Sequence, residues 1–221
     1  MIDKLSLHNV ISSDELLYLE NYFNNRTDYV VTQGMKKIPI IGAEHDAKFL
    51  ELIHNIIKNK VGIDKEYVLL GDNFYQHTTS YYPHNDSKQK NSWLNIVVPI
   101  NLDRIRGQQK FIVFDQEYKA SATWMGNYLM AGNFENNKKM SRRICDTENV
   151  GNLTGVDISD ELYAHISQGK LPKKELFGVS GHIFDWIPGD IIVFDSKYIH
   201  VTGDMQCSRK LGLSIRIGHV E

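Results

Sequence analysis

The sequence predicts an α+β domain built on an antiparallel sandwich or barrel. Two helical patterns fall within the first 60 residues, and short runs rich in β-branched and aromatic residues follow them. Helices followed by many strands, in that order, are typical of a domain whose helices are segregated to one side of a sheet. The 221 residues are 42% apolar, and no linker rich in Pro, Ser or Gly divides them. We therefore expect a single domain over residues 1–221.

Capping and apolar spacing predict the two helices. Ser12 and Glu15 have the spacing of a capping box, in which the serine hydroxyl and the glutamate carboxylate each satisfy an early backbone amide. The second segment has one apolar face at helical spacing. This face consists of Phe49, Leu50, Ile53, Ile56 and Ile57.

The predicted strands are short and bounded by Gly, Pro or Asn. They span residues 67–70, 73–79, 93–100, 110–114, 191–194 and 209–217. The pattern weakens over residues 119–180, where only 157–168 resembles a short helix with an acidic first turn. We interpret 119–180 as an insertion or lid between strands, with an ordinary long loop as the alternative.

Charge and targeting signals narrow the class of partner. The chain carries 25 Lys and Arg against 27 Asp and Glu, for a formal charge of −2, whereas proteins that bind nucleic acid by neutralising phosphates have a basic excess. The candidate basic cluster is Lys138, Lys139, Arg142 and Arg143, and clusters of this size are commonly solvated surface. The start resembles neither a signal peptide nor an anchor, and no run reaches the roughly 18 apolar residues that span a bilayer. Cys145 and Cys207 are too few for a disulfide framework, so we expect a cytoplasmic protein.

Three side chains could hold a metal ion. His84 and Asp86 lie two residues apart, so on an extended strand they point the same way. A Pro-Gly-Asp turn at 188–190 leads into an apolar strand, and His200 follows that strand. Two imidazoles and one carboxylate on one face of iron(II) leave positions for substrate and oxygen. The alternatives are a solvated His–Asp pair and a hydrogen-bonded histidine at a strand end.

The strand at 209–217 carries an arginine on its apolar face. Residues alternate along it, so Arg209 shares a face with Leu211, Leu213 and Ile215, and Arg216 lies on the other. We therefore expect Arg209 to point toward the core. A guanidinium stays charged, so it needs a carboxylate, either from a bound ligand or from an internal acid. An arginine whose head reaches solvent at the strand start is the remaining alternative.

The order of these motifs resembles the iron(II)/2-oxoglutarate-dependent dioxygenase superfamily, particularly its prolyl-hydroxylase-like and phytanoyl-hydroxylase-like branches. The likeness covers residues 72–217 and rests on His84-x-Asp86, Pro188-Gly-Asp190, His200 and Arg209.

The resemblance implies a fold, a cofactor and a reaction. The fold would be a double-stranded β-helix, or jelly roll, with iron(II) held by His84, Asp86 and His200. Arg209 would bind the distal carboxylate of 2-oxoglutarate. The reaction would use molecular oxygen to decarboxylate 2-oxoglutarate to succinate, with ascorbate as a possible reductant. Related halogenases lack the carboxylate found here at Asp86, so its presence favours hydroxylation.

Other residues are candidates for contact with the cosubstrate or substrate. The resemblance places Tyr75 near the cosubstrate, and Asn95 lies on the next strand. Packing is the alternative for both. His77 shares the parity of Tyr75, but no acid follows it two residues later. His182 and His219 have no convergent partner, so we expect them to be structural or at the surface. The aromatic residues expected to select substrate, or simply to pack, are Trp124, Tyr128, Phe134 and Trp186.

The chain departs from the prolyl-hydroxylase pattern in the strand after the metal pair. Where those enzymes often place a tyrosine, this chain has Val97, Pro99 and Ile100. The predicted function is an oxygenase that hydroxylates a small molecule, an amino acid or a peptide side chain. A variant acting on nucleic-acid bases would need the basic cluster. The alternative from another class is a jelly-roll binding or sensing domain without turnover.

Overall fold

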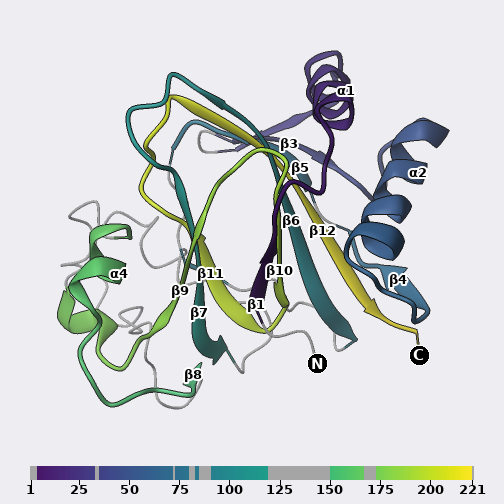
Figure 1. The fold of residues 1–221 in the computed structure, drawn as a ribbon. Helices are drawn as coiled ribbons and strands as arrows, with labels where there is room; N and C mark the ends of the chain where they lie inside the picture. Colours follow the sequence, from purple (N-terminus) through teal and green to yellow (C-terminus); the bar gives the residue numbers. More distant parts are fainter. Residues whose placement is uncertain are drawn as a thin grey trace.

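Two antiparallel sheets face each other in the computed structural model, which describes residues 4–32, 35–71, 73–79, 83–84, 91–118, 150–166 and 173–220. The helices α1 and α2 lie on the outer side of the larger sheet, and α4 lies on the far side of the smaller one (Figure 1). The predicted α+β class and the double-stranded β-helix are confirmed.

The larger sheet has the order β1-β10-β6-β12-β5-β3-β2, and β4 also pairs with β12. Its strands are β1 (Lys4–Leu7), β2 (Val30–Thr32), β3 (Met35–Pro39), β4 (Tyr67–Leu69), β5 (Asn73–His77), β6 (Ser92–Asp103), β10 (Ile191–Asp195) and β12 (Arg209–His219). In the smaller sheet, β7 pairs with β8, β9 and β11. Those strands are β7 (Lys110–Tyr118), β8 (Val150–Gly151), β9 (Gly181–Asp185) and β11 (Tyr198–Thr202).

The chain passes between the two sheets as a jelly roll requires. From β5 it crosses to His84, which forms an isolated antiparallel bridge with β11 of the smaller sheet. It returns through β6, crosses to β7 and β9, returns through β10, crosses again to β11 and ends in β12. This winding brings β11 and the segment at His84 side by side although they are far apart in sequence.

Side-chain caps mark the starts of the helices, and the capping box predicted at Ser12 is present. Ser12 caps α1 (Ser13–Asn24), and both hydrogen bonds of the capping box with Glu15 are present. Asp46 caps α2 (Ala47–Asn55), which continues into a π-helix, η1 (Ile56–Lys60). The short helix α4 (Asp160–Ala164) lies inside the predicted 157–168 segment and is followed by a 3₁₀ helix, η2 (Lys173–Leu176). No helix in the described ranges has the length and apolar character needed to cross a bilayer.

Three apolar clusters bury both faces of both sheets. The first lies between the helices and the larger sheet and includes Leu19, Phe49, Ile96 and Leu213. The second lies between the sheets, and its buried members are Tyr75, Val97, Phe111, Val113, Trp186, Ile192 and Phe194. The third covers the outer face of the smaller sheet with residues of α4, η2 and the segments beside them. Alternate residues of one strand therefore meet different surroundings, and only one set faces the interior of the roll.

The predicted insertion at 119–180 falls between β7 and β9. Its described part, 150–166 and 173–180, supplies Ile158, Leu162, Leu176 and Val179 to the third cluster. A role as a lid stays a prediction, because residues 119–149 lie outside the described ranges.

Candidate active site

The structure brings His84 and His200 together inside the roll. Their backbones exchange two hydrogen bonds, with N···O distances of 3.0 and 2.7 Å. Their ring centres lie 4.3 Å apart, with an angle of 53° between the ring planes. The His200 ring also packs against Phe194 and Phe111, at centroid distances of 4.8 and 5.8 Å. The His200 imidazole thus faces an apolar interior, with the His84 ring beside it.

This arrangement fits a shared metal ion. A carbonyl can only accept, so the His200 Nδ1–H donates to the backbone oxygen of Tyr198, 3.2 Å away. This hydrogen bond places the lone pair of the neutral ring on Nε2, the form that binds metals. With metal–nitrogen bonds of about 2.1 Å, two nitrogens on one ion lie at most about 4.2 Å apart, which rings at this separation can reach.

The third predicted ligand, Asp86, lies outside the described residues. Within the described ranges, no group of three His, Cys, Asp or Glu side chains is arranged to hold a metal. The assignment of Asp86 therefore stays a prediction.

A buried lysine lies further along the same interior. Lys210 is fully buried, and its Nζ donates to the Thr202 hydroxyl at 2.6 Å. The same Nζ lies 3.9 Å from the ring centre of Trp186. No carboxylate of the described residues forms an ion pair with it. Burial holds the pKa of Lys210 well below its usual range, because the charged form is not fully solvated.

The position of Thr202 relates this lysine to the histidine pair. Thr202 and His200 lie two residues apart on β11, so their side chains leave the same face of the strand. Their backbones are therefore about 6.4–6.8 Å apart along the strand. The interior thus holds two imidazoles at one level and the amino group of Lys210 at the next.

The Arg209 side chain points away from the interior of the roll, toward the helix layer. The prediction that it shares a face with Leu211 and Leu213 agrees with the structure, but that face packs on the helix layer. Its guanidinium Nε lies 2.6 Å from Asp103 Oδ2, and its Nη2 lies 3.6 Å from Glu20 Oε1 on α1. The structure therefore places the arginine in an ion-pair network outside the roll and does not bring it to the histidine pair.

The other predicted cosubstrate contacts line the interior. Tyr75 is buried in the cluster between the sheets, and the centre of its ring is 5.0 Å from that of His77. Asn95 is fully buried on β6 and has the parity of Val97, which faces inward. Burial lowers the pKa of His77 well below its usual value, and the nearby Lys210 and His84 lower it further. His77 is therefore neutral. Contact of Tyr75 and Asn95 with the cosubstrate stays a prediction.

Sequence reasoning overlooked Lys210 and Thr202. The available signal lies in β12 itself, where the even-numbered residues are polar or small although the strand is buried on both sides. They are Lys210, Gly212, Ser214 and Arg216. A polar face on a strand with two buried faces indicates the side that meets a site.

The remaining sequence candidates divide into surface and undescribed residues. The side chain of His182 is 57% exposed, 3.4 Å from Asp115, and exposed His219 stacks on Trp93. Cys207 is buried and free. The residues outside the described ranges are Trp124, Tyr128, Phe134, Lys138, Lys139, Arg142, Arg143 and Cys145.

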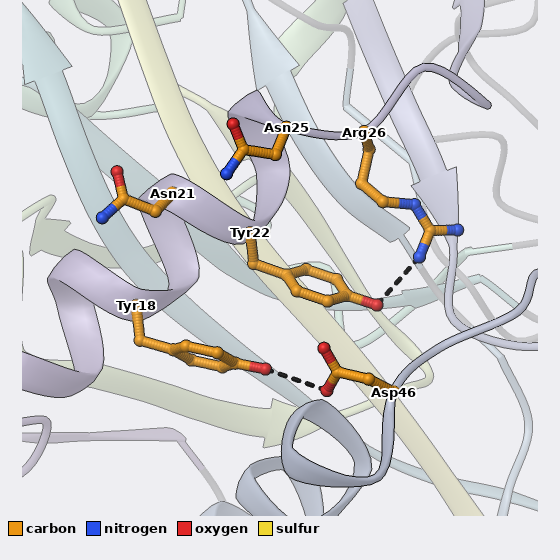
Figure 2. Close-up of a pocket in the computed structure, with 6 residues that line it drawn as sticks. All are labelled: Tyr18, Asn21, Tyr22, Asn25, Arg26 and Asp46. Carbon is orange, nitrogen blue, oxygen red and sulfur yellow. Dashed lines mark hydrogen bonds between the residues drawn. The ribbon is translucent and has the colours of Figure 1, made fainter.

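A separate pocket of about 470 Å³ lies at the surface of the helix layer. Its lining residues are Tyr18, Asn21, Tyr22, Asn25, Arg26 and Asp46. Figure 2 shows the Tyr18 hydroxyl donating to Asp46 at 3.1 Å and Arg26 donating to the Tyr22 hydroxyl at 2.9 Å. The Tyr18–Asp46 bond joins α1 to the start of α2, where Asp46 also caps the helix, whereas the Arg26–Tyr22 bond lies at the end of α1. We interpret this pocket as part of the helix packing.

Comparisons with known proteins identify structures that share this fold. No protein-family model matches the sequence, and no curated protein matches it. Solved structures do match. HygX from Streptomyces hygroscopicus, with nickel and 2-oxoglutarate bound, is 13% identical over 97% of this chain and 82% of its own, with a TM-score of 0.56. A 2OG-Fe(II) oxygenase family oxidoreductase from Burkholderia pseudomallei is 10% identical over 97% and 84%, with a TM-score of 0.56.

A prolyl hydroxylase from Trichoplax adhaerens, in complex with a hypoxia inducible factor oxygen degradation domain peptide fragment, is also similar. It is 11% identical over 97% of this chain and 83% of its own, with a TM-score of 0.52. Identities this low carry information about architecture. The chain has the double-stranded β-helix fold of the 2OG-Fe(II) oxygenases, the superfamily that its motif order resembles.

Proposed function

We propose that the protein is a non-haem iron(II) and 2-oxoglutarate-dependent oxygenase that hydroxylates a small molecule, an amino acid or a peptide side chain. One observation carries the proposal. Inside a roll of this fold, the His84–His200 pair and the buried Lys210 ammonium are separated by one step of β11. A short dicarboxylic acid could chelate a metal ion at the histidine pair with one end and bind Lys210 with the carboxylate at its other end.

The metal would be held by His84, His200 and, from the sequence resemblance, Asp86. When bound, iron(II) supplies the activation of molecular oxygen that organic side chains cannot provide. In the overall reaction 2-oxoglutarate loses carbon dioxide and becomes succinate. One oxygen atom enters the new carboxylate of succinate, and the other becomes the hydroxyl of the product.

Lys210 would bind the distal carboxylate, the role that the resemblance implied for Arg209. A buried ammonium costs free energy unless an anion accompanies it. The described residues give Lys210 a hydroxyl and an aromatic face but no carboxylate. A bound dicarboxylate would supply the missing charge, whereas Arg209 already has Asp103 and Glu20.

The walls of the site would exclude water during the reaction. The cluster between the sheets includes buried Phe111, Ile192 and Phe194. The two phenylalanine rings pack on His200. An apolar lining strengthens the attraction between a bound carboxylate and Lys210, since the local dielectric constant is low. It also limits side reactions with water.

The structures with this fold support the cosubstrate and the breadth of substrates. HygX was solved with nickel and 2-oxoglutarate, and the Trichoplax enzyme with a peptide fragment. By analogy, we propose metal and 2-oxoglutarate binding for this chain and leave both small molecules and peptides as substrate classes.

Calorimetry with the redox-inert ion Mn(II) tests the proposal. The parent protein should bind Mn(II), and 2-oxoglutarate should then bind only in its presence. Lys210→Met should abolish 2-oxoglutarate binding and retain Mn(II) binding. The matched variant, Arg209→Met, should retain both.

Two results would contradict the proposal. Loss of 2-oxoglutarate binding in Arg209→Met with retention in Lys210→Met would return the role to the arginine. Absence of any metal-dependent 2-oxoglutarate binding in the parent, together with no succinate formation with iron(II) and ascorbate, would favour the jelly-roll binding domain.

A further inference from the structure

Trp186 lies in the interior, between the two sheets. It follows β9, and its backbone N–H donates to the carbonyl of Gln109 at 2.9 Å. Its side chain is part of the cluster between the sheets, with ring centroids 6.0 Å from Phe111 and 6.4 Å from Tyr75. The residue is 2% exposed, so bulk water does not reach the ring.

The indole nitrogen has an unmet hydrogen bond. Trp186 Nε1 is buried and has no partner among the described residues. Buried N–H groups nearly always have partners, and an unsatisfied one costs about 1–3 kcal/mol. A polar group left in this state inside a candidate site points to an acceptor that arrives with a ligand.

The backbone of β12 is shaped to admit the indole. A Cβ atom at Gly212 would lie 2.6 Å from Trp186 Cζ2 and 2.8 Å from Cη2. Only a residue without a side chain permits that approach, so the glycine and the tryptophan fit as a pair. The ring is thereby held with its face toward Lys210, whose Nζ lies 3.9 Å from the ring centre.

Three potential donors lie close together here. The Lys210 ammonium is one. The Thr202 hydroxyl accepts from that ammonium, so its own hydrogen can donate to a second acceptor. The indole N–H lies at the edge of the ring that the ammonium covers. A carboxylate has about four lone-pair sites on two oxygens, so it can accept from all three groups.

We propose that the Trp186 indole N–H donates a hydrogen bond to the distal carboxylate of bound 2-oxoglutarate, and that this bond helps the site to select a dicarboxylic 2-oxo acid. The inference rests on the proposed function, because it needs the cosubstrate in the site. It assigns to Trp186 a contact with the cosubstrate, where the sequence left substrate selection or packing open.

The experiment compares Trp186→Phe with the parent, both loaded with Mn(II), by calorimetry. Phenylalanine keeps an aromatic ring beneath Lys210 but removes the N–H. The probes are 2-oxoglutarate and 2-oxopentanoate, which has the same carbon chain without the distal carboxylate. We expect Trp186→Phe to weaken the binding of 2-oxoglutarate about 10- to 100-fold, as for the loss of a hydrogen bond to a charged group. The weaker binding of 2-oxopentanoate should be unchanged.

Two controls keep the test decisive. Trp93→Phe removes an indole at the surface stack with His219 and should leave both affinities unchanged. If Trp186→Phe does not fold, β-(3-benzothienyl)alanine placed at position 186 replaces the N–H by sulfur and keeps the ring shape.

The outcomes separate the two proposals. Unchanged 2-oxoglutarate affinity, or an equal loss for both ligands, would overturn the hydrogen bond and leave Trp186 with a packing role. Failure of the parent itself to bind 2-oxoglutarate in the presence of Mn(II) would instead overturn the proposed function.

Discussion

Lys210 and Thr202 join the two sheets across the interior of the roll, with the lysine Nζ 2.6 Å from the threonine Oγ1. The lysine extends from β12 of the larger sheet and the threonine from β11 of the smaller one. A hydroxyl compensates only part of the hydration that an ammonium loses on burial. The protein therefore carries a cost in its ligand-free state that a bound anion would offset.

Replacement of this lysine should stabilise the ligand-free protein. We expect Lys210→Met to raise the free energy of unfolding by about 1–3 kcal/mol, because an apolar side chain of similar length removes a buried amino group whose charged form is poorly solvated there. Urea unfolding at neutral pH, without metal or 2-oxoglutarate, measures the change. The matched variant, Arg209→Met, should lower stability by about 1 kcal/mol, since it breaks a partly exposed ion pair. A destabilised Lys210→Met would mean that the ammonium has an internal counter-charge.

The contrast between Arg209 and Lys210, which are adjacent on β12, shows what the alternation of side chains along a strand can predict. The pattern of β12 correctly groups Arg209 with Leu211 and Leu213, because side chains alternate with a period of two. It does not say what each face meets. Both faces of β12 are buried, one under the helices and one inside the roll, so an inward arginine had two possible meanings. The choice depends on long-range packing.

Across the fold, features set by neighbouring residues could be predicted from the sequence, whereas pairings between distant segments could not. The caps at Ser12 and Ser159 satisfy amides a few residues away, so a short window of sequence contains them. Strands such as β3 and β9 were not predicted, and their hydrogen-bond partners come from distant segments. The approach of His84 to His200 likewise came from the family resemblance and could not be derived from local spacing.

The capping box predicts an acid-sensitive contribution to stability. Partial burial raises the pKa of Glu15, but hydrogen bonds from the Ser12 backbone and Lys60, at 2.8 and 3.0 Å, outweigh it and leave the pKa below its usual value. A carboxyl with a lower pKa in the folded state contributes stability that is present above its unfolded pKa, about 4.3, and is lost as the pH falls through the folded pKa. Glu15→Gln should therefore be less stable than the parent at neutral pH.

The same variant should approach the parent in acid. Urea unfolding at a series of pH values below about 5 measures the difference. Ser12→Ala serves as the control, because it keeps the Ser12 backbone donor and Lys60, so most of the acid dependence should remain. Parallel curves for Glu15→Gln and the parent at every pH would show that this carboxylate has the same pKa in both states.

The close approach of Trp186 to β12 predicts a cost for any side chain at position 212. Gly212→Ala would place a methyl group 2.6 Å from the buried indole, so the ring or the strand must shift. We expect a loss of about 1–3 kcal/mol in the free energy of unfolding, as for other overpacked cores. Gly107→Ala is the control, since its nearest neighbour is the flexible end of Gln206 at 3.0 Å. Equal effects would mean that the indole can move freely.

The histidine pair predicts a metal-dependent rise in thermal stability. An ion that binds only the folded protein stabilises it by about 2.7 kcal/mol at a concentration one hundred times its Kd. We expect Mn(II) to raise the melting temperature of the parent and to have no effect on His200→Ala, which removes one of the two converging imidazoles. Asp86→Ala should weaken the rise and abolish succinate formation with iron(II). His182→Ala is the matched control, because that ring is 57% exposed at the surface beside Asp115. If His182→Ala abolished the effect of Mn(II) while His200→Ala kept it, the metal would bind at the surface, and the ring separation of 4.3 Å at the pair would be a packing contact alone.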